Sequence, residues 1–183
     1  MAYFFFDFKD KRKQDSRALL SSLVVQLSHQ SSPFCDILFG YHSSHQSGSH
    51  QPSDRTLTQC LEDILNLPGQ VPVYLIIDAL DECPKTTGIP SSRQKVLALV
   101  KKIVDLNLPN LRLCITSRPE IDIRTSLEIL TSNRISLHDE MGQKQDIVNF
   151  VTSVVYSDED MQRWRDDDKK LVIKTLSERA DGM

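Results

Sequence analysis

The chain has 183 residues, of which 39% are hydrophobic, and a formal net charge of −3. This length can bury one hydrophobic core with a small helical addition. The net charge gives no electrostatic drive toward nucleic acid or an anionic membrane, so we expect neither as a partner.

No apolar run is long enough to span a bilayer, and the first apolar run precedes its charges, the reverse of a signal peptide. The four cysteines, Cys35, Cys60, Cys83 and Cys114, are widely separated. This spacing favours reduced thiols over a disulfide framework. We therefore expect a cytoplasmic protein.

The first predicted element is a strand at Tyr3–Phe8, an aromatic run that ends in a basic, solvated turn. A helix capped by Asp15 or Ser16 follows, with apolar residues at near-helical spacing: Leu19, Leu20, Leu23, Val24 and Leu27. Residues 43–53 lack apolar side chains and predict a loop.

Three histidines, His42, His45 and His50, lie in or beside this loop. They raise the possibility of a metal site, but the paired Cys and His spacing of a structural zinc site is absent. A polar solvated loop is the favoured interpretation. Ser53 or Asp54 then caps a further helix, which ends at Pro68-Gly69.

Val71–Cys83 reads VPVYLIIDALDEC and is the most informative stretch. Its continuous apolar run predicts a strand buried on both faces in the middle of a sheet. Asp78, Asp81 and Glu82 follow at its carboxyl end, where open α/β sheets bind ligands. A Walker B strand has this form, and the alternative is a structural strand that ends in a solvated acidic turn.

Ser91 and Gln94 have the spacing of a capping box for a helix that extends to Val104. The next strand is Leu111–Ile115, followed by Thr116, Ser117 and Arg118. If the two strands are parallel neighbours, these polar residues lie beside Asp78. Arg118 is then either a phosphate sensor or an ion-pair partner of Asp81 or Glu82, and without a phosphate loop the ion pair is favoured.

The remaining elements are a short strand at Arg134–Leu137 and two helices. One helix covers Gln143–Val155, with Ile147, Phe150, Val151 and Val154 on one face. The last carries Leu171, Val172, Leu176 and Ala180. The predicted fold is α/β, a parallel sheet flanked by helices with a short carboxyl-terminal helical extension.

The order of these motifs resembles the NACHT branch of the STAND P-loop NTPases, in its fungal, nephrocystin-like form. The resemblance rests on D-A-L-D-E at 78–82, T-S-R-P at 116–119, YFFFDFKD at 3–10, QDIVNFV at 145–151 and LSERADGM at 176–183. It implies a partial P-loop NTPase core at 1–140 and the start of a helical domain at 141–183.

The resemblance also implies roles for individual residues. Asp78 would hold the Mg²⁺ of Mg-ATP or Mg-GTP, and Asp81 and Glu82 would be the catalytic acids near the attacking water. Thr116 and Arg118 would contact the nucleotide, with Arg118 sensing the γ-phosphate. The family activity is that of a nucleotide-dependent switch in self/non-self recognition or innate immunity.

The phosphate-binding loop of that family, G-x-x-x-x-G-K-[ST], does not occur in this sequence. In the family this loop precedes the YFFFD strand, so the chain resembles a NACHT domain without its first strand and its phosphate cradle. The family places that strand beside the sensor strand. Leu111–Ile115 would then pair with Arg134–Leu137 or expose an unpaired edge.

We therefore expect a piece of a signalling NTPase that binds no nucleotide unless the phosphate loop is restored. The alternatives are an active Mg²⁺-dependent ATP or GTP hydrolase and a non-catalytic protein-interaction module. The expected partners are protein: further copies of the chain, or other domains of the parent protein.

Overall fold

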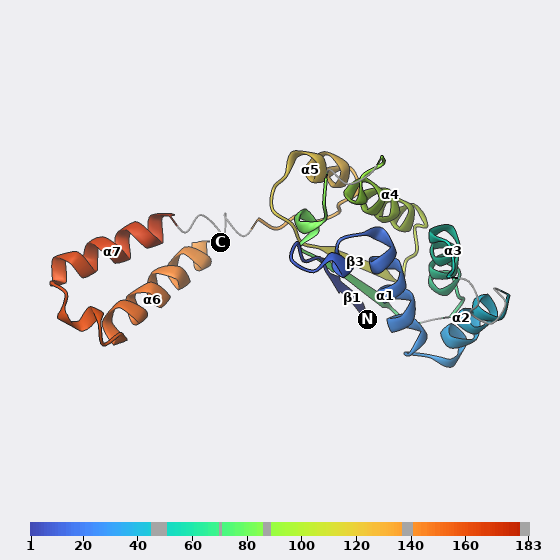
Figure 1. Cartoon of the computed structure of the whole chain (residues 1–183), viewed down its shortest axis with the longest axis horizontal. Coiled ribbons are helices and arrows are strands. Elements are labelled where there is room, and N and C mark those ends of the chain that lie inside the picture. Colours follow the sequence, from blue (N-terminus) through green and yellow to red (C-terminus); the bar gives the residue numbers. More distant parts are fainter. Residues whose placement is uncertain (45–50, 70, 86–88, 137–140, 180–183) are drawn as a thin grey trace. The chain divides into compact units, whose positions relative to one another are not determined.

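The computed structural model describes all residues except 45–50, 70, 86–88, 137–140 and 180–183, and it does not describe the side chains of 141–144. The chain divides into two compact units, Met1–Thr131 (unit 1) and Ser132–Met183 (unit 2) (Figure 1). Each unit is described by itself. None of the described helices combines the length and apolar character needed to cross a membrane.

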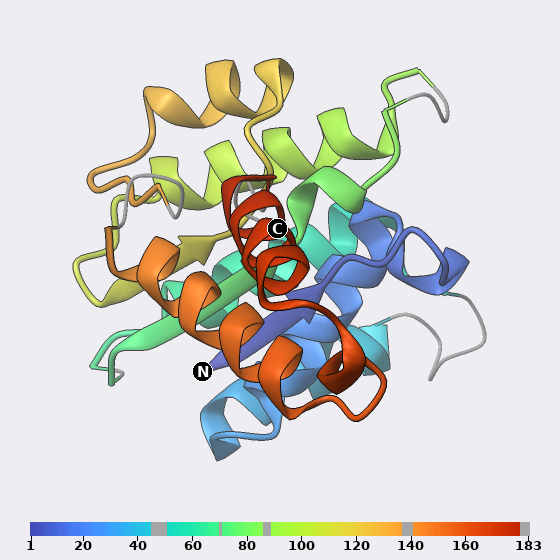
Figure 2. The same cartoon turned by 90° about the vertical axis from the view of Figure 1, so that its left-hand side faces the viewer.

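Unit 1 contains a three-stranded parallel sheet with the order β1-β2-β3 (Figure 2). The strands are β1 (Ala2–Phe5), β2 (Val73–Asp78) and β3 (Leu111–Ile115). Ile77 of β2 aligns with Phe4 of β1 on one side and with Ile115 of β3 on the other. The α/β class and the parallel pairing of the two predicted central strands are confirmed.

The crossover from β1 to β2 contains α1 (Ser16–Ser28), α2 (Ser32–Ser44) and α3 (Asp54–Leu65), preceded by a 3-10 turn, η1 (Lys11–Lys13). The crossover from β2 to β3 contains η3 (Leu80–Glu82) and α4 (Ser92–Asp105), and α5 (Ile121–Glu128) follows β3. The sequence analysis did not anticipate α2 or α5. Both crossovers step across the sheet in the same direction, so right-handed connections put α1 and α4 on the same face.

Three of the helices begin at caps of the predicted kind. The Asp15 carboxylate accepts a hydrogen bond from the Ala18 amide, and the Ser53 hydroxyl accepts one from the Thr56 amide. At α4, Ser91 and Gln94 exchange side-chain-to-backbone hydrogen bonds, which confirms the capping box. These caps fix where the chain leaves each loop and enters the core.

The sheet of unit 1 is buried on one face only. Leu75 and Ile77 of β2 are fully buried, whereas Tyr74 between Val73 and Leu75 is 51% exposed. Tyr3 and Phe5 of β1 are exposed on the same face as Tyr74. The prediction of burial on both faces was wrong, because an uninterrupted apolar run conceals which face is covered. The buried face packs with α1, α3 and α4 in one core.

The sheet ends at β3. Residues 134–136, predicted to form a further strand, have no strand structure, and Leu137 lies outside the described residues. β3 is accordingly an edge strand, and its core-facing residues, Leu111, Leu113 and Ile115, are only half-buried. Residues 134–136 therefore do not pair with β3. The expected alternative, an unpaired edge at β3, is the arrangement found among the described residues.

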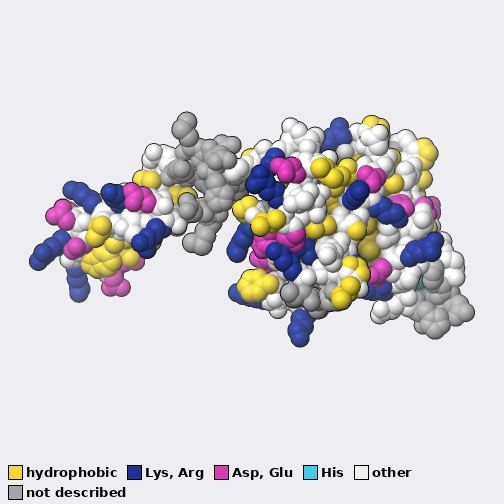
Figure 3. Space-filling model, turned by 90° about the horizontal axis from the view of Figure 1, so that it is seen from above, with side chains coloured by type: hydrophobic (Ala, Val, Ile, Leu, Met, Phe, Trp, Pro, Cys, Tyr) yellow, Lys and Arg dark blue, Asp and Glu magenta, His cyan; other side chains and the backbone are white. Residues whose placement is uncertain are grey.

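Unit 2 consists of α6 (Met141–Ser157), a 3-10 turn, η5 (Met161–Arg163), and α7 (Asp166–Arg179). Val155 is buried between the helices, and the Lys169 ammonium lies 5.3 Å from the centre of the Tyr156 ring. Of the predicted apolar face of α6, Ile147 and Val151 are half-buried, whereas Phe150 and Val154 are exposed, so only part of that face packs within the unit. Figure 3 shows an apolar patch on this unit surrounded by charged side chains.

All four cysteines are free thiols. Cys60 and Cys83 are buried, and burial raises the pKa of Cys60 to about 11 and that of Cys83 to about 12. Among the histidines, His42 is exposed at the end of α2, and His45 and His50 lie outside the described residues. The described residues contain no group of three metal-ligating side chains.

The one-sided burial of the sheet predicts opposite outcomes at two adjacent residues. Leu75→Ala removes fully buried methyl groups and should lower the free energy of unfolding by about 2–5 kcal/mol. Tyr74→Ala removes a half-exposed ring and should cost less than about 1 kcal/mol. Urea unfolding followed by circular dichroism measures both. Equal losses would show that the face carrying Tyr74 is covered.

Candidate functional site

The predicted site residues converge at the carboxyl ends of β2 and β3. Asp78 is the last residue of β2, and Asp81 and Glu82 lie in η3 directly after it. Thr116 and Arg118 follow β3, the parallel neighbour of β2. Because parallel strands end at the same edge of a sheet, these five side chains share one edge, as predicted.

Asp78 is held by the hydroxyl of Thr116, which donates a hydrogen bond to Asp78 Oδ1. The same hydroxyl oxygen accepts a hydrogen bond of 3.0 Å from the amide of Ala79. Ala79 has φ 53° and ψ 46°, a left-handed conformation that non-glycine residues adopt at some energetic cost. This turn redirects the chain from β2 into η3. Thr116 therefore lies beside Asp78, as the sequence predicted.

Asp81 binds Arg118 by backbone and side chain. The Arg118 amide donates to Asp81 Oδ1 at 2.9 Å, and Arg118 Nε lies 3.6 Å from Asp81 Oδ2. The Arg118 side chain is 82% exposed, so this ion pair contributes little to stability. The ion-pair interpretation is therefore the arrangement found, and the guanidinium remains accessible from solvent.

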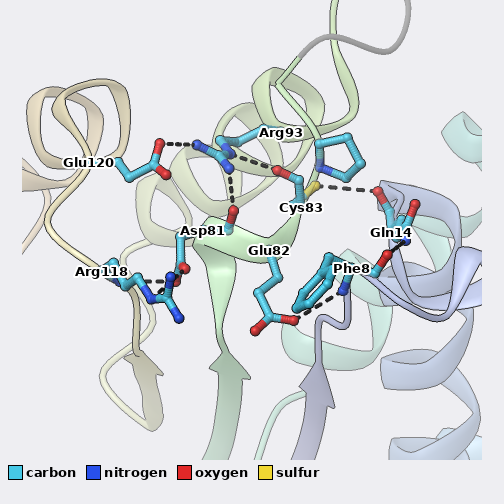
Figure 4. Close-up of a pocket in the computed structure, with 9 residues that line it drawn as sticks. Phe8, Gln14, Asp81, Glu82, Cys83, Arg93, Arg118 and Glu120 are labelled. Atoms are coloured by element: carbon cyan, nitrogen blue, oxygen red, sulfur yellow. Dashed lines mark hydrogen bonds and ion pairs between the residues drawn. The ribbon is translucent and has the colours of Figure 1, made fainter. Parts of the chain in front are cut away.

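Glu82 connects the turn after β2 to the segment after β1. Its Oε2 accepts a hydrogen bond of 3.0 Å from the amide of Phe8. A pocket of about 360 Å³ opens between these segments (Figure 4). It is lined by Phe8, Gln14, Asp81, Glu82, Cys83, Pro84, Arg93, Arg118 and Glu120. The two predicted catalytic acids thus border a pocket, and Asp78 does not line it.

The donor set at this edge does not form a metal site by itself. Asp78 Oδ1 accepts the Thr116 hydroxyl, which leaves its other oxygen as the available ligand. Mg²⁺ in proteins takes one or two carboxylates together with waters and substrate phosphate oxygens. Asp78 is suitable as one such ligand, but the remaining coordination would have to come from a bound phosphate and from water.

Arg93, which the sequence analysis did not identify, is the buried cation of the site. It is the second residue of α4, and only 4% of its surface is exposed. Its Nε donates to the Cys83 carbonyl at 2.8 Å, its Nη2 to the Asp81 carbonyl, and its Nη1 to Glu120 Oε2 at 2.7 Å. One guanidinium therefore joins the η3 turn to the segment that follows Arg118 (Figure 4).

Glu120 and Asp122 complete this cluster with Lys85. The Lys85 ammonium pairs with Glu120 and lies 3.2 Å from Asp122 Oδ1. Hydrogen bonds from Lys85 and then Arg93 lower the pKa of Glu120. Burial alone would raise the pKa of Asp122, but Lys85 and Arg93 outweigh it and lower that pKa. The two carboxylates therefore stay charged around the two cations.

The sequence analysis missed this cluster because no local sequence pattern distinguishes its residues from ordinary surface charges. Arg93 occupies the first turn of a capped helix, where an arginine is normally solvated. Glu120 and Asp122 follow the T-S-R-P motif at the start of α5, a helix that was itself not predicted. The available signal was the proximity of Glu120 to Arg118 in sequence, which pointed to more charge at this edge.

Removing the buried guanidinium tests its structural role. Arg93→Met should lower the free energy of unfolding by about 2–5 kcal/mol, because it leaves two carbonyls unpaired and Glu120 and Asp122 with Lys85 alone. Arg55→Met is the matched control, since Arg55 is also the second residue of a capped helix and is exposed. Chemical unfolding of both variants measures the difference, and similar losses would contradict this role.

The lowered pKa of Glu120 predicts a dependence on pH. A carboxyl whose pKa falls on folding stabilises the folded state above its ordinary value of 4.5, and this stabilisation is lost as the pH falls through the folded-state pKa. Glu120→Gln should therefore reduce stability at about pH 7 and have a smaller effect at about pH 3. Glu128→Gln, on the exposed side of α5, is the control.

Urea unfolding midpoints at both pH values provide the measurement. If the unfolding midpoints of Glu120→Gln and the parent chain differ by the same amount at both pH values, Glu120 does not have the lowered pKa.

The comparisons with known proteins connect this geometry to one family. The family model described as "Nephrocystin 3, N-terminal" matches residues 1–118, which include all three strands and end at Arg118. No curated protein matches the sequence, and no solved structure does. The matched region covers more than half of the chain and contains the five predicted site residues, so the chain belongs to the nephrocystin 3 N-terminal family.

Proposed function

We propose that this chain is a piece of a NACHT-type STAND NTPase that acts as a nucleotide-dependent signalling switch. In this proposal the carboxyl ends of β2 and β3 form the part of a nucleotide site that contacts the metal ion and the attacking water. The chain alone neither binds nor hydrolyses nucleotide. The family membership supports the nephrocystin-like part of this proposal, and the NACHT assignment rests on the motifs described above.

The observation that carries the proposal is the convergence of acids and an exposed arginine at one sheet edge. Asp78 and Arg118 belong to segments 40 residues apart in sequence, yet both lie where adjacent parallel strands end. This edge is where open α/β sheets bind phosphate-containing ligands. Arg118 is also accessible to a ligand, since its guanidinium is mostly exposed.

The resemblance assigns each residue a role in the completed site. Asp78, positioned by Thr116, would be the protein ligand of Mg²⁺, which neutralises phosphate charge when bound with nucleotide. Asp81 and Glu82 would lie beside the attacking water. Arg118 would leave its long contact with Asp81 Oδ2 and turn toward the γ-phosphate.

Two features support inactivity of the isolated chain. The sequence has no G-x-x-x-x-G-K-[ST] loop to surround phosphates with amides and a lysine. In addition, each of the three acids already accepts a hydrogen bond from within the chain, from Thr116, the Arg118 amide or the Phe8 amide.

The missing loop has a large energetic effect. Charge-assisted hydrogen bonds contribute roughly 1.5–3 kcal/mol each, so the loss of three weakens binding by about 5–9 kcal/mol. At about 1.4 kcal/mol for each tenfold change, a micromolar affinity would fall beyond the millimolar range.

A second candidate is a non-catalytic protein-interaction module. It is favoured by the open, partly aromatic face of the sheet in unit 1 and by the unpaired edge of β3. A third, an active hydrolase, requires a phosphate site elsewhere in these residues. Nucleotide binding distinguishes the three.

Calorimetric titration of the 183-residue chain with Mg-ATP and Mg-GTP is the first test. We expect no saturable binding at millimolar nucleotide and no hydrolysis above background, with no effect of Asp78→Asn or Glu82→Gln. Saturable binding in the range of tens of micromolar would contradict the proposal and favour the active hydrolase.

The second test restores the missing part. Adding the phosphate-loop strand of a NACHT-type protein before Met1 should create Mg-nucleotide binding, and Asp78→Asn should then reduce hydrolysis at least about tenfold. Asp105→Asn is the control, because Asp105 is the last residue of α4 and is not one of the proposed site residues. If the restored chain is folded but does not bind, the interaction module becomes the favoured function.

A further inference from the structure

The two edges of the sheet in unit 1 are built differently. At β1 the outward backbone groups are bonded to glutamines of α1. The Tyr3 amide donates to Gln26 Oε1 at 3.0 Å, and Gln26 Nε2 donates to the Tyr3 carbonyl at 2.7 Å. Gln30 Nε2 likewise donates to the Met1 carbonyl at 2.7 Å. These side chains close the β1 edge to pairing with another strand.

The outward groups of β3 can be identified from its bonds to β2. The Asn110 carbonyl accepts from the Val73 amide at 2.8 Å, and the Thr116 amide donates to the Ile77 carbonyl at 3.0 Å. Alternate residues of a strand direct their backbone groups to opposite sides. Even-numbered residues of β3 therefore face β2, and Leu111, Leu113 and Ile115 face away from it.

Only part of this outer edge is already bonded. The Leu111 amide donates to the Leu108 carbonyl at 3.2 Å, and the Leu111 carbonyl accepts from Arg112 Nη1 at 2.9 Å. At Leu113 and Ile115, no described residue bonds the outward amides and carbonyls. Of the protections that edge strands commonly carry, β3 has one charged side chain, Arg112, and no proline.

We propose that two copies of this chain pair through β3, antiparallel and about a two-fold axis, to form a continuous six-stranded sheet. A second copy suits this edge because it offers the same free groups. These are the amide and carbonyl of Leu113 and those of Ile115, two residues further along the strand. Pairing a strand with itself in antiparallel orientation gives this isologous arrangement. The proposal needs no nucleotide and goes beyond the proposed switch function.

The free groups also fix the register. If Leu113 pairs with the partner's Ile115, all free amides and carbonyls are used in both copies, and Cys114 faces the partner's Cys114. If Leu113 paired with the partner's Leu113 instead, Ile115 would face the partner's Leu111, whose groups are occupied. If Arg112 faced the partner's Arg112, like charges would be directly opposed, which is unfavourable. The register centred on Cys114 is therefore the favoured one.

The side chains on the open face are complementary in this register. Arg112 lies opposite the partner's Thr116, and the partner's Asp78 lies one strand further on the same face. Both Arg112 and Cys114 are exposed in the single chain. The two-fold axis thus brings an exposed arginine of each copy toward a carboxylate of the other. On the opposite face, the half-buried Leu113 packs beside the partner's Ile115.

Analytical ultracentrifugation of the full chain tests the dimer. We expect reversible association with a dissociation constant on the order of 10–100 µM, as for a small interface. Cys114→Lys places two lysines opposite each other and should weaken association at least about tenfold. Cys35→Lys, at an exposed cysteine of α2, is the matched control and should leave association unchanged.

Ile115→Pro is a second variant that removes an outward amide without removing a bond to β2. An edge strand tolerates proline at such a position, so the monomer should stay folded by circular dichroism while association weakens at least about tenfold.

Disulfide formation tests the register. Diamide takes two electrons and two protons from a pair of thiols and becomes a hydrazine, which leaves a disulfide bond. Directly opposed residues on antiparallel strands lie within disulfide range. The parent chain and Cys35→Ser should form covalent dimers, and Cys114→Ser should associate without forming them.

Two results would overturn the proposal. One is a folded chain that remains monomeric at concentrations on the order of several hundred micromolar. The other is a dimer that keeps its affinity in both Cys114→Lys and Ile115→Pro, since the copies would then meet elsewhere. Nucleotide binding affects neither result, so failure here is separate from failure of the proposed switch function.

Discussion

The buried guanidinium of Arg93 holds together the segments that follow β2 and β3. It bonds two carbonyls of the turn after β2 and two carboxylates beyond β3. Without it, the η3 turn and the segment from Arg118 to Asp122 would be connected mainly by exposed contacts. A buried charge is tolerated only when its donors are satisfied, and Arg93 meets that condition at the start of α4. The positions of Asp81 and Arg118 therefore depend on a residue that need not touch a ligand.

The same edge shows how a few hydroxyl and backbone donors can hold acidic residues in place. Thr116 bonds both the Asp78 carboxylate and the amide of the strained residue Ala79. Glu82 is held by the Phe8 amide. Each of these carboxylates is therefore held by its own donor within the chain. In the nucleotide site that we propose, the acids would exchange these internal donors for a phosphate-bound ion.

The sequence allowed the α/β class, the parallel pairing of β2 and β3, the capping box at Ser91 and the proximity of Thr116 to Asp78 to be predicted. These features depend on local patterns and on the common geometry of parallel strands. Arg93 and Glu120 were missed because their pairing is a tertiary contact between residues that look like ordinary surface charges. One-sided burial was missed because Tyr74 and its neighbours are all apolar, so alternation could not be seen. The strand predicted at 134–137 is not formed at 134–136, because four residues form a stable strand only when they pair with a neighbour.

The dimer and a restored phosphate-loop strand would both pair with the outer side of β3. In the NACHT-type sheet that we propose, the strand before the phosphate loop would lie beside β3. A strand edge forms one set of ladder bonds, so that strand and a second copy of the chain exclude each other. An attached strand acts at an effective concentration in the millimolar range, well above the free concentration of a second copy. Completing the nucleotide site would therefore displace the dimer, and the oligomeric state would depend on whether the phosphate-loop strand is present.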